Sequence, residues 1–274
     1  MQIRSARHVK SSAAAKHRRT TIRPNRADIT AGATIHDVAA ARASGKSVPA
    51  VDVGGTSVKI LASGQTQHRK FPSGPTLTPG RMVAEVKKLA ADWTYEVVSI
   101  GYPGPVLHGQ PIAEPNNLGR GWVGYDFVGA FGRPVKVVND AAMQALGSYK
   151  GGKMLFLGLG TGLGAAMIVE GIMEPMELGQ LPYKKRTYEY YVGRVGLERD
   201  GKRTWRRHVA DVLDRLVAAL RPDDTVIGGG NATKLKTLKP GYSRGENANA
   251  FRGGFQLWSK DNAASLRLRP DRAR

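Results

Sequence analysis

The chain has 274 residues, of which 41% are hydrophobic, and its 42 Lys and Arg outweigh 22 Asp and Glu to give a formal net charge of +20. A chain of this size buries roughly three-quarters of its unfolded surface, which excludes disorder throughout. It has no run of 18 apolar residues and no cysteine, so a membrane-spanning helix, disulfides, thiolate metal sites and cysteine catalysis are excluded. The lack of cysteine fits a reducing compartment.

The positive charge extends over the whole chain. Residues 1–50 carry ten Lys or Arg and two Asp, a net charge of +8, and residues 51–274 carry the remaining +12. A field of this size attracts polyanions, such as nucleic acid, an anionic membrane or an inorganic phosphate polymer.

Residues 1–47 show little apolar periodicity and are predicted to form a flexible basic tail. Residues 1–26 are rich in Arg and Ser and contain no acid. Three interpretations stay open: a disordered tail, including one that arises from a start codon assigned too early, an arm that binds polyanions, and an organelle transit peptide.

Ordered structure is predicted from Val48 onward. Residues 48–53 and 57–62 are rich in β-branched side chains and flank a Gly-Gly turn, so they predict two consecutive strands. Thr78-Pro79 predicts the start of a helix. Further strands are predicted at 96–104 and 134–140, and a helix over 141–149. The apolar face of the first helix consists of Met82, Val83, Val86, Leu89, Ala90 and Trp93.

The second half of the chain repeats this order. Strands at 153–160 and 165–171 flank a second Gly-rich turn, and an apolar stripe predicts a helix over 204–220. A strand at 225–230, a helix at 231–236 and a last helix at 247–258 follow. The stripe consists of Trp205, Val209, Val212, Leu213, Leu216, Val217 and Leu220, and the last helix turns Phe251, Phe255 and Trp258 inward.

This repetition predicts an α/β fold of two similar lobes. The first covers 48–138, with the helix 247–258 packing back on it, and the second covers 139–246, followed by a basic tail at 259–274. A cleft between two such lobes is the natural ligand site.

The sequence DVGGT (52–56) brings an acid, two glycines and a hydroxyl together. Without Cβ atoms, Gly54 and Gly55 allow the backbone to approach a phosphate, and Thr56 adds a hydroxyl donor. Asp52 is a candidate to hold Mg²⁺ through water, and Lys59 on the next strand is a candidate phosphate contact. The alternative is a plain hairpin turn.

Two further glycine segments extend this pattern. LGLGTGLG (157–164) is a second turn of the same kind, and it is neither a P-loop nor a dinucleotide fingerprint. GGGN (228–231) ends one predicted strand and opens a helix, where it would hold an anion or an adenosine, or form a plain turn.

Asn139 and Asp140 follow the predicted strand 134–140 at its carboxyl end, where ligands bind in α/β sheets. Asp140 is a candidate to accept a proton from a substrate hydroxyl. The alternative is a helix N-cap, for which Asn and Asp are both favoured.

Together these pieces resemble the ROK (repressor, open reading frame, kinase) family of sugar kinases, which has the two-lobed actin/hexokinase-like (ribonuclease H-like) fold. Within that family the chain looks most like the polyphosphate glucokinase branch. The matching segments, in family order, are DVGGT (52–56), YPGPV (102–106), NNLGRGW (116–122), VVND (137–140), LGTGLG (159–164), ELGQ (177–180) and VIGGG (226–230).

The resemblance implies a role for each matching residue. Asp140 matches the catalytic base that takes the proton of the sugar 6-hydroxyl. The residues that match sugar-binding positions are Asn117, Asn139, Glu177, Gln180 and Glu189. Those that match the phosphate and adenosine loops are Asp52, Gly54, Gly55, Thr56, Gly160, Thr161, Gly162, Gly164, Gly228, Gly229 and Gly230.

The chain departs from the family pattern at three points. Gln180 replaces the histidine of the family's ELGH motif, which contacts sugar, so the identity of the sugar is open. The cysteine-rich zinc motif of many members is absent, and no zinc is expected. Residues 1–47 are too short and aperiodic for the winged helix of the family's regulators, so specific binding to nucleic acid is not expected.

The resemblance therefore implies a phosphotransferase that uses Mg²⁺ and transfers a phosphoryl group from polyphosphate or ATP to O6 of glucose. It also implies a cytoplasmic homodimer that binds no membrane. Two alternatives stay open. One is an ATP-dependent kinase for another hexose. The other is a polyanion- or nucleic-acid-binding protein that has the kinase scaffold but has lost the activity. Gln180 and the net charge of +20 favour this second alternative.

Overall fold

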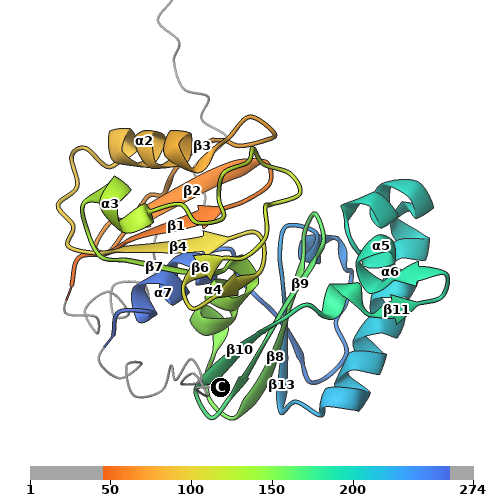
Figure 1. Ribbon diagram of the computed structural model, residues 1–274. Coiled ribbons are helices and arrows are strands. Elements are labelled where there is room, and N and C mark those ends of the chain that lie inside the picture. Colours follow the sequence, from red (N-terminus) through yellow and green to blue (C-terminus); the bar gives the residue numbers. More distant parts are fainter. Residues whose placement is uncertain (1–45, 260–274) are drawn as a thin grey trace, which may run out of the picture. The chain divides into compact units, whose positions relative to one another are not determined.

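The computed structural model describes residues 46–259 (Figure 1). Apart from Lys46, Ser47 and Ser259, the predicted tails at 1–47 and 259–274 lie outside the described residues. Within those residues, no helix is both long enough and apolar enough to cross a membrane.

The first five-stranded sheet has the order β3-β2-β1-β4-β7. Its first three strands are antiparallel neighbours, whereas β1, β4 and β7 run parallel. Both predicted strands that flank the first glycine turn are present as β1 and β2. The strands span Pro49–Val53 (β1), Ser57–Ala62 (β2), Arg69–Pro72 (β3), Val98–Tyr102 (β4) and Val135–Asn139 (β7).

The second sheet repeats this topology in the order β10-β9-β8-β13-β14. Again the first three strands in the chain are antiparallel and the next two join in parallel. The strands span Lys153–Leu159 (β8), Leu163–Val169 (β9), Ile172–Met176 (β10), Asp224–Gly228 (β13) and Tyr242–Arg244 (β14). In both sheets a glycine turn joins the first two strands, as the repeated pattern predicted.

Helices cover both faces of the first sheet (Figure 1). On one face, α2 (Pro79–Leu89) and α3 (Phe127–Phe131) complete a core with Val51, Ile60 and Ile100. Thr78 caps α2 through a hydrogen bond from the Arg81 amide, as predicted from Thr78-Pro79. On the other face, Phe251 and Phe255 of α7 (Asn249–Gln256) pack on β1.

Helix α4 (Asp140–Ser148) packs between the two sheets. Its core contains Val138 of the first sheet and Met154 and Phe156 of the second. Helices α4 and α7 cross at glycines: a Cβ on Gly147 would lie 2.0 Å from the Asn249 carbonyl oxygen. Only glycine allows two helix backbones to approach this closely, so α4 and α7 form one tightly packed unit.

The other face of the second sheet is covered by α5 (Tyr188–Val192) and α6 (Arg194–Leu220). The predicted stripe of α6 faces the sheet, but the helix begins ten residues earlier than predicted. It is kinked at Gly201, whose φ of 70° is left-handed. Such a break interrupts the apolar periodicity, and for that reason the pattern indicated only the second part of the helix.

Another prediction was wrong. Residues 231–236 form no α-helix, because only the single 3₁₀ turn η2 (Ala232–Lys234) follows β13. The remaining short elements connect the main ones: η1 (Leu178–Gln180), the hairpin β5–β6 (Val106–Leu107, Gln110–Pro111) and the hairpin β11–β12 (Pro182–Tyr183, Arg186–Thr187).

Candidate active site

The first glycine turn joins β1 to β2 and is held from two sides. The Gly54 amide donates to the Ser57 carbonyl at 3.1 Å, and the Ser73 hydroxyl donates to the Gly54 carbonyl at 2.6 Å. A Cβ on Gly54 would lie 2.9 Å from the Ser57 oxygen, so the turn requires glycine there. In the described part of the chain, the amides of Gly55 and Thr56 donate to no protein acceptor.

The second glycine turn joins β8 to β9 and faces the first. A Cβ on Gly55 would lie 3.4 Å from the Thr161 hydroxyl oxygen and 3.6 Å from Cβ of Asn117. Among the described residues, the amides of Thr161 and Gly162 also lack a protein acceptor. Two opposed turns with free amide donors are suited to bind an anion between them.

Neighbouring elements hold the second turn in place. The Arg194 amide at the start of α6 donates to the Thr161 carbonyl at 3.0 Å, and the Asn231 side chain donates to the Gly160 carbonyl at 2.9 Å. The carboxylate of Glu189 accepts from the Leu163 amide at 3.2 Å. Glu189 therefore supports the phosphate-type turn directly, in addition to the sugar contact that the resemblance implies.

Asn139 and Asp140 lie where β7 ends and α4 begins. The Asn139 oxygen accepts from the amides of Ala141 and Ala142, and its amide nitrogen donates to the Gly104 carbonyl at 3.0 Å. Asn139 thus caps α4, and the second hydrogen of its amide has no acceptor among the described residues. Because Asn139 caps the helix, the carboxyl of Asp140, the first residue of α4, is not needed as the cap.

Electrostatics single out Asp140. Burial, together with the negative charges of Asp52 and Glu177, raises its pKa to about 7 against the opposing hydrogen bond from Ala141. A carboxyl with a pKa near neutrality is matched to the task of a general base.

The acids predicted at the site lie close enough to influence one another. Burial raises the pKa of Glu177, and the charge of Glu189 adds to the effect. Burial also raises the pKa of Asp52, against the attraction of Lys59, whose Nζ lies 3.7 Å from the Asp52 carboxylate. The fold therefore gathers four predicted acids around the two glycine turns: one each from β1, α4 and α5, and Glu177 directly before η1.

The predicted adenosine glycines lie at the end of the second sheet. Gly229 has a φ of 81°, and a Cβ there would lie 2.5 Å from the Leu159 carbonyl oxygen. Gly228 packs on the ring of Phe156, while Gly230 has open space around it. These constraints explain the first two glycines by packing alone, and only Gly230 is left free to face a ligand.

Two predicted sugar contacts are exposed side chains. Gln180 ends η1, and its backbone amide donates to the Glu177 carbonyl at 3.1 Å. Its side chain is exposed and makes no hydrogen bond to the described residues. Asn117 lies opposite Gly55, as described above. Sequence reasoning missed Asn231 as a turn support, although the segment GGGN contained it.

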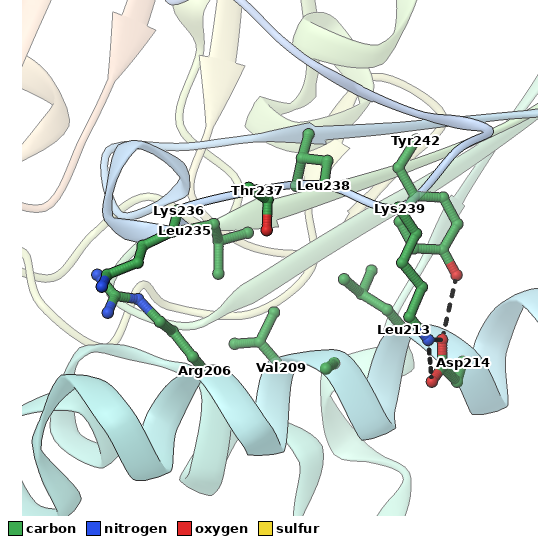
Figure 2. Close-up of a pocket in the computed structure, with 11 residues that line it drawn as sticks. Arg206, Val209, Leu213, Asp214, Leu235, Lys236, Thr237, Leu238, Lys239 and Tyr242 are labelled. Atoms are coloured by element: carbon green, nitrogen blue, oxygen red, sulfur yellow. Dashed lines mark hydrogen bonds and ion pairs between the residues drawn. The ribbon is translucent and has the colours of Figure 1, made fainter.

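Figure 2 shows a cavity whose lining contains none of these four acids. It has a volume of about 180 Å³ and lies between α6 and residues 235–242, directly after η2. Val209, Leu213 and Leu235 give it an apolar lining. At one end Lys239 and Tyr242 converge on Asp214, and the Lys239 ammonium lies 2.6 Å from that carboxylate.

The residues of the site fit a hydrated Mg²⁺ ion. Among the described residues no cluster of three or more His, Cys, Asp or Glu is arranged to hold a metal. Mg²⁺ needs no such cage, because it keeps several waters and binds one or two carboxylates together with substrate phosphates. Asp52, a hard oxygen donor beside the first glycine turn, meets this need.

Several known proteins are similar to this chain in sequence or in fold. The sequence model of the ROK family matches residues 48–175. A polyphosphate glucokinase of Mycobacterium tuberculosis is 28% identical over 212 residues, which cover 69% of this chain and 80% of that protein. The crystal structure of an inorganic polyphosphate/ATP-glucomannokinase from an Arthrobacter strain matches with a TM-score of 0.68 at 23% identity, over 77% of this chain and 98% of that one.

A second solved structure agrees with the fold. A ROK family glucokinase from Streptomyces griseus matches with a TM-score of 0.65 at 17% identity, over 77% of this chain and 98% of that one. The repeated five-stranded sheets and these neighbours define the two-lobed actin/hexokinase-like fold. The chain is similar to the ROK family over residues 48–175 and to polyphosphate glucokinases over about two thirds of its length.

Proposed function

We propose that the protein transfers a phosphoryl group from inorganic polyphosphate, with ATP as a second donor, to the 6-hydroxyl of glucose. The observation that carries the proposal is the carboxyl of Asp140, whose pKa is raised to about 7, beside two opposed glycine turns with free amide donors. The names of the M. tuberculosis and Arthrobacter relatives support both the donor and the class of sugar.

In this proposal Asp140 accepts the proton of the attacking sugar hydroxyl. Glu177, Glu189, Gln180, Asn117 and the remaining amide hydrogen of Asn139 are the proposed sugar contacts. Phosphoryl transfer depends mainly on positioning and on stabilisation of charge, so rigid support of the reacting groups matters more than covalent chemistry. The cap that Asn139 places on α4 supplies that rigidity directly beside the base.

The donor phosphates would bind between the glycine turns. The free amides of Gly55, Thr56, Thr161 and Gly162 would donate to their oxygens, and the Lys59 ammonium would add positive charge. Asp52 is the proposed ligand of Mg²⁺, which when bound neutralises charge on the transferring phosphates.

Basic surface favours polyphosphate as the donor. Residues 183–208 hold nine Lys or Arg against three acids. Arg194 and Arg199 are taken up by Glu198 and Asp200. In the described part of the chain no carboxylate pairs with Lys202, Arg203 or Arg207, so these cations add to the positive field that attracts a polyanion.

The cavity of Figure 2 supports ATP as the second donor. Its apolar lining is suited to a flat base, and Arg206, Lys236 and Lys239 contribute cations around it. It adjoins η2, which follows the Gly228–Gly230 segment, so a nucleotide would extend from the glycine turns toward α6.

Salt dependence tests the donor. If several cations bind polyphosphate, its KM should rise steeply between about 50 and about 200 mM salt, because counterions are released on binding. The KM for ATP should rise much less, since its contacts are mainly backbone amides. Equal shallow slopes, or no turnover with polyphosphate, would contradict polyphosphate as donor and leave an ATP-dependent hexose kinase.

Substitution of Gln180 tests the sugar. Gln180→His restores the side chain of the family's ELGH motif at an exposed position, where the side chain has no hydrogen bond to the described residues to lose. We expect a lower KM for glucose and an unchanged KM for the donor. An unchanged or higher KM for glucose, measured beside mannose and other hexoses, would mean that the pocket is built for another sugar.

A further inference from the structure

A row of charged side chains crosses the first sheet beside the proposed base. In the strand register Asp52 of β1 pairs with Lys59 of β2, and Lys59 pairs with Lys70 of β3. On its other side Asp52 pairs with Gly101 of β4, where a Cβ would lie 3.4 Å from Cα of Asp140. The row therefore runs from Asp140 outward to the edge strand.

The three charged side chains of the row share one face of the sheet, because directly paired residues of neighbouring strands point the same way. Ala50, two residues before Asp52, shares that face, and a Cβ on Gly254 of α7 would lie 2.5 Å from its Cβ. Lys59 is 35% exposed and Lys70 is exposed, so the outer part of the row is open to a ligand.

Positive charge along the row exceeds what the single carboxylate of Asp52 balances. Lys59 pairs with Asp52, whereas among the described residues no acid pairs with Lys70. His68 stacks on Phe251, and its pKa is lowered by burial and by the nearby charges of Lys59 and Lys70. Like charges directly opposite one another, such as those of Lys59 and Lys70, destabilise a sheet. An anionic ligand bound between them would remove this repulsion.

The row and the first glycine turn are held together. Strand β3 contains Lys70 and ends at Pro72, directly before Ser73. The Ser73 hydroxyl donates to the Gly54 carbonyl, and the Ser73 amide donates to the Thr56 carbonyl at 3.2 Å. Two strand spacings, about 10 Å, separate Asp52 from Lys70. A ligand that joins the turn to Lys70 must therefore be an extended anion with several charges.

We propose that Lys59 and Lys70 bind the tail of an inorganic polyphosphate chain whose terminal phosphate lies between the glycine turns. This rests on the proposed use of polyphosphate as a donor. ATP has no further phosphate to place on Lys70, because its base would lie toward α6. The two donors therefore share the reacting phosphate and diverge beyond it, and Lys70 determines specificity for the polymer.

Lys70→Ala tests this assignment. We expect the KM for long-chain polyphosphate to rise by roughly tenfold, the effect of losing one charge-assisted contact. The slope of log KM against log salt should fall by about one. The KM for ATP, the KM for sugar and kcat should stay unchanged, and the melting temperature should not fall, because a repulsion is removed.

Two controls accompany this variant. Lys87→Ala removes the same charge from an exposed position on α2, which covers the opposite face of the sheet. The double variant Lys202→Ala/Arg203→Ala removes cations of α6 and tests the alternative path for the tail. An equal effect of Lys87→Ala, a larger effect of the α6 variant, an equal rise in the KM for ATP or a lower melting temperature would each overturn the proposal.

Direct binding separates this proposal from the donor assignment. If the wild-type protein shows no turnover with polyphosphate, the donor assignment fails, and calorimetry with polyphosphate then decides about the row. Weaker binding to Lys70→Ala than to the wild type and to Lys87→Ala would support it. Equal binding to all three, or none, would overturn it.

Discussion

Asp140→Asn should lower kcat by ~10²–10⁴ and leave the KM for sugar almost unchanged, as expected when a positioned general base is lost. The carboxyl must be deprotonated to accept the proton of the hydroxyl. Because its pKa is raised to about 7, the wild-type rate should rise with pH and level off above about pH 7. Rates measured across this range for both donors check the expectation.

A matched control is Asp126→Asn. Asp126 caps α3 through the Gly129 amide, and asparagine caps equally well, so this variant should keep full activity and stability. If the folded Asp140→Asn variant retained more than about a tenth of the wild-type kcat, the rate lost with the carboxyl would fall below the ~10²–10⁴-fold contribution typical of a general base. Asp140 would then be only the first residue of α4.

The same substitution should stabilise the protein in a pH-dependent way. Since the pKa of Asp140 in the folded state lies above the ordinary aspartate value of 3.8, the folded state holds a proton that the unfolded chain releases. The wild type therefore loses stability as the pH rises from about 4 to about 7. The excess melting temperature of Asp140→Asn over the wild type should grow across this window and then stay constant.

Gly253→Ala should have the largest effect on stability. A Cβ there would lie 1.8 Å from the Met143 carbonyl oxygen and 3.0 Å from the Gly147 amide nitrogen, so α4 and α7 must separate. Overpacking of this kind costs about 3 kcal/mol or more, which lowers the melting temperature by on the order of 10 °C in a chain of this size. Thermal unfolding measured by circular dichroism checks it.

Gly80→Ala is the matched control for this substitution. Gly80 lies in the first turn of α2, and a Cβ there would meet only the Tyr125 hydroxyl at 3.5 Å, an ordinary contact. Alanine is the better helix former, so the control should be neutral or slightly stabilising. A melting temperature of Gly253→Ala close to that of Gly80→Ala would show that the helix crossing is looser than described.

The glycine turns were predictable because their requirements are local. Gly54 must be glycine on account of the Ser57 carbonyl three residues away, and such short-range patterns are visible in the sequence. Asn139 and Asp140 were predictable for the same reason, since a polar pair at the end of an apolar strand indicates both a cap and a site. The resemblance to a family then assigned roles to these residues.

Contacts between distant residues were not predictable in this way. The Asn231 side chain reaches the Gly160 carbonyl 71 residues away, and Glu189 accepts from an amide 26 residues before it. The helix predicted at 231–236 is absent, because its first residue turns toward that carbonyl and the backbone continues into the wall of the cavity. Local helix propensity gave way to tertiary contacts.

The sequence by itself determined the strands, the two glycine turns, the capped start of α4 and the excess of positive charge, because periodicity, turn chemistry and composition are properties of neighbouring residues. Only the tertiary structure decided that the turns face each other, that Asp52 and Glu177 raise the pKa of Asp140, and that Lys70 stands beside Lys59. Each of these depends on strand register and helix packing, which join segments far apart in the chain.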